Sequence, residues 1–242
     1  MNEYLSMKLE RTIFEKSHVY FLAFFLLVLA AFWVTYITRI FDQENYRMHL
    51  HGATLFLWCL MLIIQPLLIR KRMNLLHRRI GKFSFVLVPI LVFTTFDLLR
   101  YRMKSQGAID YASMALVLNA LIAFIILYGL AIYHRKKVAL HARYMLCTVF
   151  PFLTPATDRV ISIYFPSTLE YFPLLNGQPN VMVFGFVLAD VILIALCIWD
   201  WRSHRRLDVF PIALAVLLWY HHSVNTYYQY NFWKTFCDWL IY

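Results

Sequence analysis

Hydrophobic side chains dominate seven stretches of the chain, and polar side chains gather between them. Each stretch holds about the 20 residues that a helix needs to cross the hydrocarbon core of a membrane. In chain order, the stretches are residues 19–40, 46–69, 80–99, 111–133, 142–165, 180–201 and 209–230. The pattern predicts an all-α fold, a polytopic membrane helix bundle with seven transmembrane helices.

The composition also indicates a membrane protein. Of the 242 residues, 62% are hydrophobic and 15% are charged, and the mean hydropathy is +0.60. Such values are typical of chains that span membranes. We therefore expect a multi-pass protein of the cell membrane, in bacteria the inner membrane, with membrane lipids as its partners. A homo-oligomer or a larger membrane complex is left open.

The lysines and arginines indicate the orientation of the chain. Most of the 23 lie in the amino-terminal segment and in the second, fourth and sixth connections, all on one side of a seven-span bundle. Cytoplasmic loops carry an excess of these residues, so we predict the N-terminus inside and the C-terminus outside. The net charge of +10 is then explained by the basic residues of the predicted cytoplasmic loops. Nucleic-acid binding is not expected, because the charge sits in short loops rather than on a soluble face.

The predicted organisation has three parts. Residues 1–18 form a cytoplasmic N-terminal segment, residues 19–230 form the seven-helix transmembrane domain, and residues 231–242 form an aromatic interfacial tail. Aromatic side chains are typical of such a tail, because they favour the membrane–water interface.

A weak internal repeat lies within the transmembrane domain. It relates residues 46–99 to residues 111–165, and its basic turns, RKRMNLLHRR at 70–79 and HRKKVALHAR at 134–143, align without a gap. The alignment pairs His77 with His141 and Arg79 with Arg143. The repeat predicts two related helix hairpins.

Polar side chains collect in the outer half of the predicted bundle, on a rise of about 1.5 Å per residue. They are His51, Asp97, Asn119, Asp158, Asp190 and His222. A charge at such depth costs a few kcal/mol and normally faces the bundle interior with a partner. The cluster is therefore a hypothesis for a functional site.

Imidazoles and carboxylates in a closed bundle suit zinc or another divalent metal with a bound water. In this hypothesis His51, Asp97 and either His222 or His221 bind the metal. Asp158 is then the general base that takes a proton from the bound water.

The structural alternative assigns the same residues to packing. Asp97 pairs with Arg100 and Asp158 with Arg159, while the histidines form hydrogen bonds near the interface. His49 joins the site only if the helix start is frayed, because it points about 200° away from His51.

Asp190 distinguishes these interpretations, because no basic residue lies within one turn of it on its own helix. In a packing role it would bond to a neighbouring helix, with Asn119 or Asn225 as natural partners. In a functional role it would face the same cavity as His51 and His222, and we predict this second arrangement.

His77 and His141 suggest a second kind of site. Two histidines at equal depth on different helices are what a bis-imidazole haem requires, so haem b is the alternative cofactor. Against it, both histidines lie in charged turns, where they also suit an anchor that contacts anionic lipid head groups.

The motif HLHGATLFLW, the QP pair and LHRRIGK, followed by LHARYM and DR, resemble an uncharacterised family of bacterial multi-pass membrane proteins. The resemblance covers roughly residues 46–162, and it implies a polytopic bundle without an established activity. The matching positions are His51, Gln65, Pro66, His77, Arg78, Gly81, His141, Met145 and Arg159. The paired histidines also give a looser similarity to diheme b-type transmembrane cytochromes, whose histidine pairs lie within spans.

Three functions follow from these observations. The first is a metal-dependent membrane protein, a hydrolase of lipid-like or small amphipathic substrates with its site open to the outer leaflet. The second is a b-type haem protein that transfers electrons. The third is a non-enzymatic membrane subunit or assembly factor whose buried polar groups specify helix packing.

Overall fold

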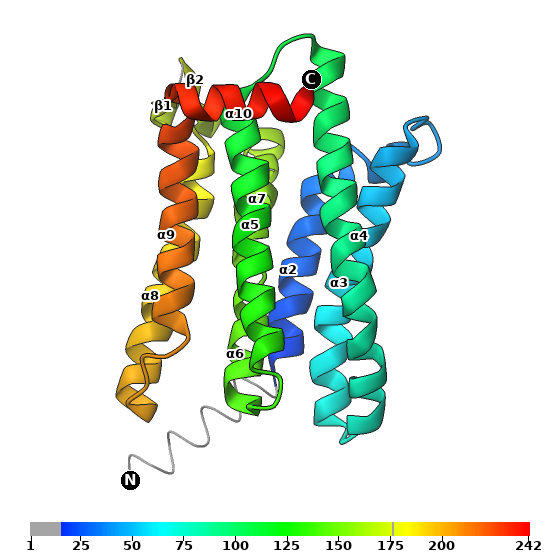
Figure 1. The fold of residues 1–242 in the computed structure, drawn as a ribbon, viewed down its shortest axis with the longest axis vertical. Coiled ribbons are helices and arrows are strands. Elements are labelled where there is room, and N and C mark those ends of the chain that lie inside the picture. Colours follow the sequence, from blue (N-terminus) through cyan, green and yellow to red (C-terminus); the bar gives the residue numbers. More distant parts are fainter. Residues whose placement is uncertain (1–15, 176) are drawn as a thin grey trace. The chain divides into compact units, whose positions relative to one another are not determined.

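The computed structural model describes residues 16–175 and 177–242 of the chain (Figure 1). These residues form α-helices, short 3₁₀ turns and one two-stranded hairpin, which confirms the predicted all-α class. The chain divides into two compact units, Met1–Arg102 and Met103–Tyr242. We call them the amino unit and the carboxy unit and describe each by itself. Most of the predicted cytoplasmic segment 1–18 lies outside the described residues.

The amino unit contains α2, α3 and most of α4. Its elements are α2 (Ser17–Trp33), η1 (Ile37–Arg39), α3 (Tyr46–Arg70) and α4 (Asn74–Gln106), the last of which continues into the carboxy unit. Asn45 caps α3, because its side chain accepts the Arg47 backbone N–H at 3.1 Å. Threonine hydroxyls join α3 to α4 in the buried interior, where Thr54 and Thr94 lie 3.1 Å apart.

The carboxy unit holds six further α-helices in the described residues. With the 3₁₀ turns and strands between them, the elements in chain order are α5 (Tyr111–Tyr133), α6 (Val138–Cys147), α7 (Phe150–Tyr164), η2 (Pro166–Tyr171), β1 (Leu174–Leu175), β2 (Gln178–Pro179), α8 (Met182–His204), α9 (Phe210–Thr226), η3 (Tyr227–Gln229) and α10 (Asn231–Ile241). The strands β1 and β2 pair antiparallel, and the turn between them includes Gly177 at φ 75°. A glycine suits this left-handed conformation.

The predicted stretch 142–165 is divided into two helices. Helix α6 ends at Cys147, and α7 begins at Phe150, one residue before Pro151. Proline has no backbone N–H to continue the helical ladder, which accounts for a break in the helix beside Pro151.

Helices α5, α8 and α9 supply most of the core of the carboxy unit. The largest side chains buried there include Leu127, Leu193, Leu217 and Tyr220. Helices α7 and α8 approach closely at Gly185, where a Cβ atom would lie 2.5 Å from Thr157 Oγ1. Helices α5, α8 and α9 also expose large apolar side chains on their outer surfaces, as in a bundle surrounded by lipid.

Among the residues that the structure describes, four helices are long and apolar enough to cross a membrane, judged by length and composition. They are α3, α4, α5 and α8, and α2 is a shorter apolar helix. These helices support the assignment to the membrane class.

The two basic turns of the sequence repeat begin their second helices at equivalent positions. Helix α4 starts at Asn74 and α6 starts at Val138, which are paired in the alignment of the repeat. The preceding turns are short, because α3 ends at Arg70 and α5 ends at Tyr133.

Candidate functional site

A carboxylate and an imidazole meet inside the carboxy unit. Asp190 of α8 and His221 of α9 form a close pair, with Oδ2 and Nδ1 3.0 Å apart. The His221 side chain is 7% exposed and the Asp190 side chain 21%. Phe186, one helical turn before Asp190, stacks on the imidazole with a centroid distance of 4.2 Å. The pair is therefore held between two apolar helices, with one side of the imidazole against an aromatic ring.

Several polar atoms of this region have no hydrogen-bond partner within residues 16–175 and 177–242. They are Oδ1 of Asp190, Nε2 of His221 and the hydroxyl of Tyr220, and all three are buried. Buried polar groups in proteins almost always have a partner, either a protein group or a water molecule. The Asp190–His221 pair therefore offers both an acceptor oxygen and a second ring nitrogen to a further group.

The polar turn of α9 around His221, residues 220–225, also joins neighbouring helices. Asn119 of α5 donates to the Ser223 hydroxyl at 2.8 Å, and both side chains are buried. Asn225 donates to the His221 carbonyl oxygen at 2.7 Å and accepts from Asn180 at 3.0 Å. These hydrogen bonds fix the rotation of α9, so they hold the His221 side chain toward α8.

The predicted partners of Asp190 are thus engaged elsewhere. Asn119 bonds to Ser223 and Asn225 bonds to Asn180, while Asp190 bonds to an imidazole. His222 lies on the exposed side of α9, whereas His221 is 6% exposed. The structure therefore places His221, and not His222, beside Asp190.

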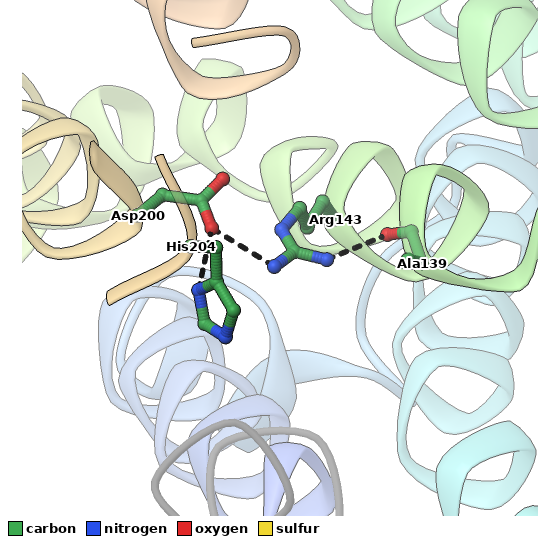
Figure 2. Close-up of polar contacts among 4 residues, drawn as sticks. All are labelled: Ala139, Arg143, Asp200 and His204. Carbon is green, nitrogen blue, oxygen red and sulfur yellow. Dashed lines mark hydrogen bonds and ion pairs between the residues drawn. The ribbon is translucent and has the colours of Figure 1, made fainter. Parts of the chain in front are cut away.

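A second carboxylate, which is buried, lies ten residues further along α8. Figure 2 shows Asp200 between Arg143 of α6 and His204 of α8, with Arg143 also pointing to the Ala139 carbonyl oxygen. The Arg143 guanidinium donates to Asp200 Oδ1 at 2.9 Å, and His204 Nδ1 lies 3.1 Å from the same oxygen. The Arg143 and Asp200 side chains are 0% and 2% exposed. Two opposite charges thus compensate each other in the interior.

The cluster of Arg143, Asp200 and His204 was not predicted from the sequence. Arg143 appeared only as a partner of Arg79 in the repeat, and Asp200 was assigned to an apolar span. The spacing of Asp200 and His204, four residues apart on one helix, was the available signal. Nothing in the sequence indicated that Arg143 on a different helix would complete the cluster.

In the amino unit, Asp97 pairs with an arginine of the neighbouring helix. The Arg47 Nε donates to Asp97 Oδ2 at 2.9 Å, and both side chains are about one-third exposed. The same guanidinium lies over the Tyr101 ring, with a centroid distance of 4.9 Å. This ion pair gives the Asp97 carboxylate a partner 50 positions away in sequence, whereas the sequence predicted its neighbour Arg100.

The two histidines at the start of α3 have different surroundings. His49 Nε2 donates to the Gln43 carbonyl oxygen at 2.7 Å, and its Nδ1 lies 2.9 Å from the Tyr36 hydroxyl. Both ring nitrogens of His49 are therefore engaged in fixing the chain before α3. His51 Nδ1 lies 3.3 Å from the Thr95 hydroxyl of α4.

Asp158 and Arg159 are half-buried on α7. The Arg159 guanidinium donates to the Pro155 carbonyl oxygen at 2.8 Å. This bond returns the Arg159 side chain to the preceding turn of its own helix.

The repeat histidines each bond to the helix before their own turn. His141 Nδ1 donates to the Ala131 carbonyl oxygen at 2.8 Å. His77 Nδ1 accepts a hydrogen bond from the side-chain amide nitrogen of Gln65. The side-chain oxygen of Gln65 accepts the Gly81 backbone N–H at 3.1 Å. Each histidine thus fastens its own helix hairpin.

No group of three or more His, Cys, Asp or Glu side chains that could hold a metal ion occurs in the part of the chain that the structure describes. The predicted metal-binding property is therefore not supported there. The closest arrangement of these residue types that bears on the prediction is the Asp190–His221 pair.

Comparison with family models, with curated proteins and with solved structures finds no match for this chain. The resemblance to an uncharacterised family of bacterial membrane proteins therefore stays a prediction.

Proposed function

We propose that the protein is a seven-span protein of the cell membrane that uses Asp190 and His221 for acid–base chemistry on a small amphipathic or lipid-like substrate. The observation that carries this proposal is the buried pair at 3.0 Å, with Nε2 and Oδ1 left unpartnered within the described residues. Placing ionisable side chains within a membrane costs free energy, so such a pair indicates a functional site.

The seven-span topology is supported by the helix order. The helical segments α2, α3, α4, α5, α6 with α7, α8 and α9 occupy the seven predicted stretches. Helices α2 and α9 have 17 residues each, which is at the short end of the spanning range. A reporter enzyme fused after Tyr242 should be active only outside the cytoplasm, and one inserted at residues 136–138 only inside. The reverse result would contradict the proposed orientation.

The proposed roles follow from the two nitrogens of the imidazole. Asp190 Oδ2 accepts the Nδ1–H of His221, which fixes the tautomer and leaves the Nε2 lone pair to take a proton. No hydroxyl or thiol within the described residues bonds to Nε2, so a water molecule is the group that His221 would activate. The reaction class is hydrolysis, with the Asp190 carboxylate stabilising the imidazolium that forms.

This chemistry uses the pair without a metal. A catalytic zinc ion takes three protein ligands in addition to water, and the pair supplies two. His51 and Asp97 were the further ligands expected from sequence, with His222 as the alternative to His221. Asp97 pairs with Arg47, His51 Nδ1 lies 3.3 Å from the Thr95 hydroxyl, and His222 is exposed. We therefore assign His221 as the general base, in place of Asp158.

Adjacent histidines provide a matched test of this role. Purified protein would be incubated with a lipid extract of its host membrane and with synthetic amphipathic esters, and the products would be followed by mass spectrometry. We expect H221Q to reduce turnover by about 10²- to 10⁴-fold, as loss of a general base does. H222Q should leave turnover unchanged, because His222 is exposed. Equal turnover by wild type and H221Q would contradict the proposal.

The hydrogen bonds of residues 220–225 favour a second candidate, a non-enzymatic subunit in which α9 is locked to α5 and α8. In that case wild-type protein shows no turnover, and H221Q and S223A lower the thermal unfolding midpoint by similar amounts. In the enzymatic case H221Q removes activity from protein that remains folded. Size-exclusion chromatography and the unfolding midpoint separate these outcomes.

A further inference from the structure

We propose that the outward-predicted end of the carboxy unit carries a binding site for a zwitterionic phospholipid head group. A cavity of about 420 Å³ lies there, where α5 begins and α10 starts. Its lining includes Asp110, Tyr111, Tyr228, Gln229 and Lys234. The inference does not depend on the chemistry assigned to Asp190 and His221.

The cavity presents one fixed negative charge. Asp110 is the N-cap of α5, where its Oδ1 accepts the backbone N–H groups of Ala112 and Ser113, both at 3.1 Å. Its Oδ2 accepts the Ser113 hydroxyl at 2.6 Å. These bonds hold the carboxylate in place at the cavity wall.

The cavity also presents one positive charge, Lys234 of α10. Within the described residues Lys234 and Asp110 line the same cavity without forming an ion pair with each other. A ligand that carries both an ammonium and a phosphate group would pair with both side chains at once. The combination of the two charges therefore indicates a zwitterion rather than a simple anion.

Two tyrosine rings of the cavity are fixed by their hydroxyl groups. The Tyr111 hydroxyl donates to Asp238 at 2.9 Å, and the Tyr228 hydroxyl accepts from the Gln229 amide at 3.0 Å. Aromatic faces attract ammonium groups, and quaternary ammonium groups in particular. Together with the Asp110 carboxylate, the rings form the ammonium side of the proposed site.

The position of α10 indicates that the zwitterion is a lipid. In Figure 1 α10 lies across the ends of α5 and α9, and Trp233 anchors it by donating to the Tyr111 carbonyl oxygen at 3.0 Å. One face of α10 is buried, and burial raises the pKa of Cys237 on that face to about 12. The other face exposes aromatic side chains, Phe232, Phe236 and Trp239. Such a helix lies in the membrane interface, at the level of the lipid head groups.

The test compares two lipids with identical short acyl chains, phosphatidylcholine and phosphatidylglycerol, by native mass spectrometry of the detergent-solubilised protein. We expect wild-type protein to retain phosphatidylcholine preferentially. D110N should weaken phosphatidylcholine binding by about tenfold or more, because it removes the partner of the ammonium. It should not weaken phosphatidylglycerol binding. Asparagine caps helices as well as aspartate does, so α5 should remain intact.

K234Q should weaken the binding of both lipids, because both contain a phosphate. K104Q is the matched control, since Lys104 is an exposed lysine of the same unit outside the cavity lining, and it should change neither. Unaltered phosphatidylcholine binding by folded D110N would overturn the proposal. So would equal binding of free phosphocholine and the lipid, because the site would then serve a soluble zwitterion.

Discussion

Helix α8 carries two carboxylates in contrasting surroundings, one partly buried and one fully buried. Asp190 and Asp200 are ten residues apart, about 15 Å along the helix axis. Asp200 is 2% exposed and meets the guanidinium of Arg143 at 2.9 Å, with His204 on the same oxygen. Asp190 is 21% exposed and meets only the imidazole of His221, with one oxygen unpartnered within the described residues.

The difference between the two pairs lies in their partners. An arginine stays charged at all physiological pH values, so the Arg143–Asp200 pair is a permanent ion pair. An imidazole has two ring nitrogens, and Nε2 of His221 has no hydrogen-bond partner within the described residues, so it is available to a further group. We infer that the cluster of Arg143, Asp200 and His204 holds the fold together, while the Asp190–His221 pair is available for chemistry.

The largest effect is expected from Arg143→Met. The substitution leaves the Asp200 carboxylate buried without its guanidinium partner, and breaking a buried pair in this way costs about 3–5 kcal/mol. Thermal and chemical unfolding of the detergent-solubilised protein measures the loss. Arg79→Met is the matched control, because Arg79 is the repeat counterpart of Arg143 but is exposed, and its effect should stay within about 0.5 kcal/mol.

A double variant sharpens this prediction. Arg143→Met combined with Asp200→Leu removes both charges and fills the space with apolar atoms, so it should regain most of the lost stability. If the double variant were as unstable as Arg143→Met alone, the loss would come from packing rather than from an unpaired charge.

A smaller effect is expected from Gly185→Ala, which tests the packing of α7 against the part of α8 that carries Asp190. Gly185 lies five residues before Asp190, and a Cβ atom there would lie 2.6 Å from the Thr154 Cα and 2.5 Å from Thr157 Oγ1. Helix α8 would have to move away from α7, at a cost of about 1–3 kcal/mol.

Gly129 of α5 provides the control for this substitution. It lies within a helix, and a Cβ atom there would meet nothing within 4 Å. Gly129→Ala should therefore stabilise the protein by up to about 1 kcal/mol, through helix propensity alone. Similar unfolding midpoints for the two alanine variants would contradict the close approach of α7 and α8.

The sequence was sufficient to predict the helical class and the approximate helix ranges, because these depend on apolar length. It was also sufficient to select Asp190, whose charge is conspicuous within an apolar stretch. Such features are local, and a helix displays them whatever its neighbours are.

The pairing of side chains was not predictable in the same way. Adjacent residues on a helix point about 100° apart, so the sequence alone could not decide between His221 and His222. That choice depends on the contacts of α9 with α5 and α8. Likewise Asp97 has a local candidate in Arg100, but the Arg47 partner comes from a separate helix.

The smallest change in stability is expected from Asp190→Asn, and it compares the two carboxylates directly. The asparagine oxygen can still accept the Nδ1–H of His221, so the hydrogen bond and the ring orientation are kept while the charge is lost. The loss of stability should be at most about 1 kcal/mol, which is the net contribution of a typical hydrogen bond. Asp200→Asn, by contrast, leaves the fully buried Arg143 guanidinium facing a neutral amide, and should cost about 3 kcal/mol or more. Unfolding midpoints of the two asparagine variants measure this difference, and turnover by the Asp190→Asn protein should still fall, because its neutral amide cannot stabilise the imidazolium that forms on His221. If the two variants unfold alike, the two carboxylates have the same structural role. The distinction between a structural Arg143–Asp200 pair and a chemical His221–Asp190 pair then fails.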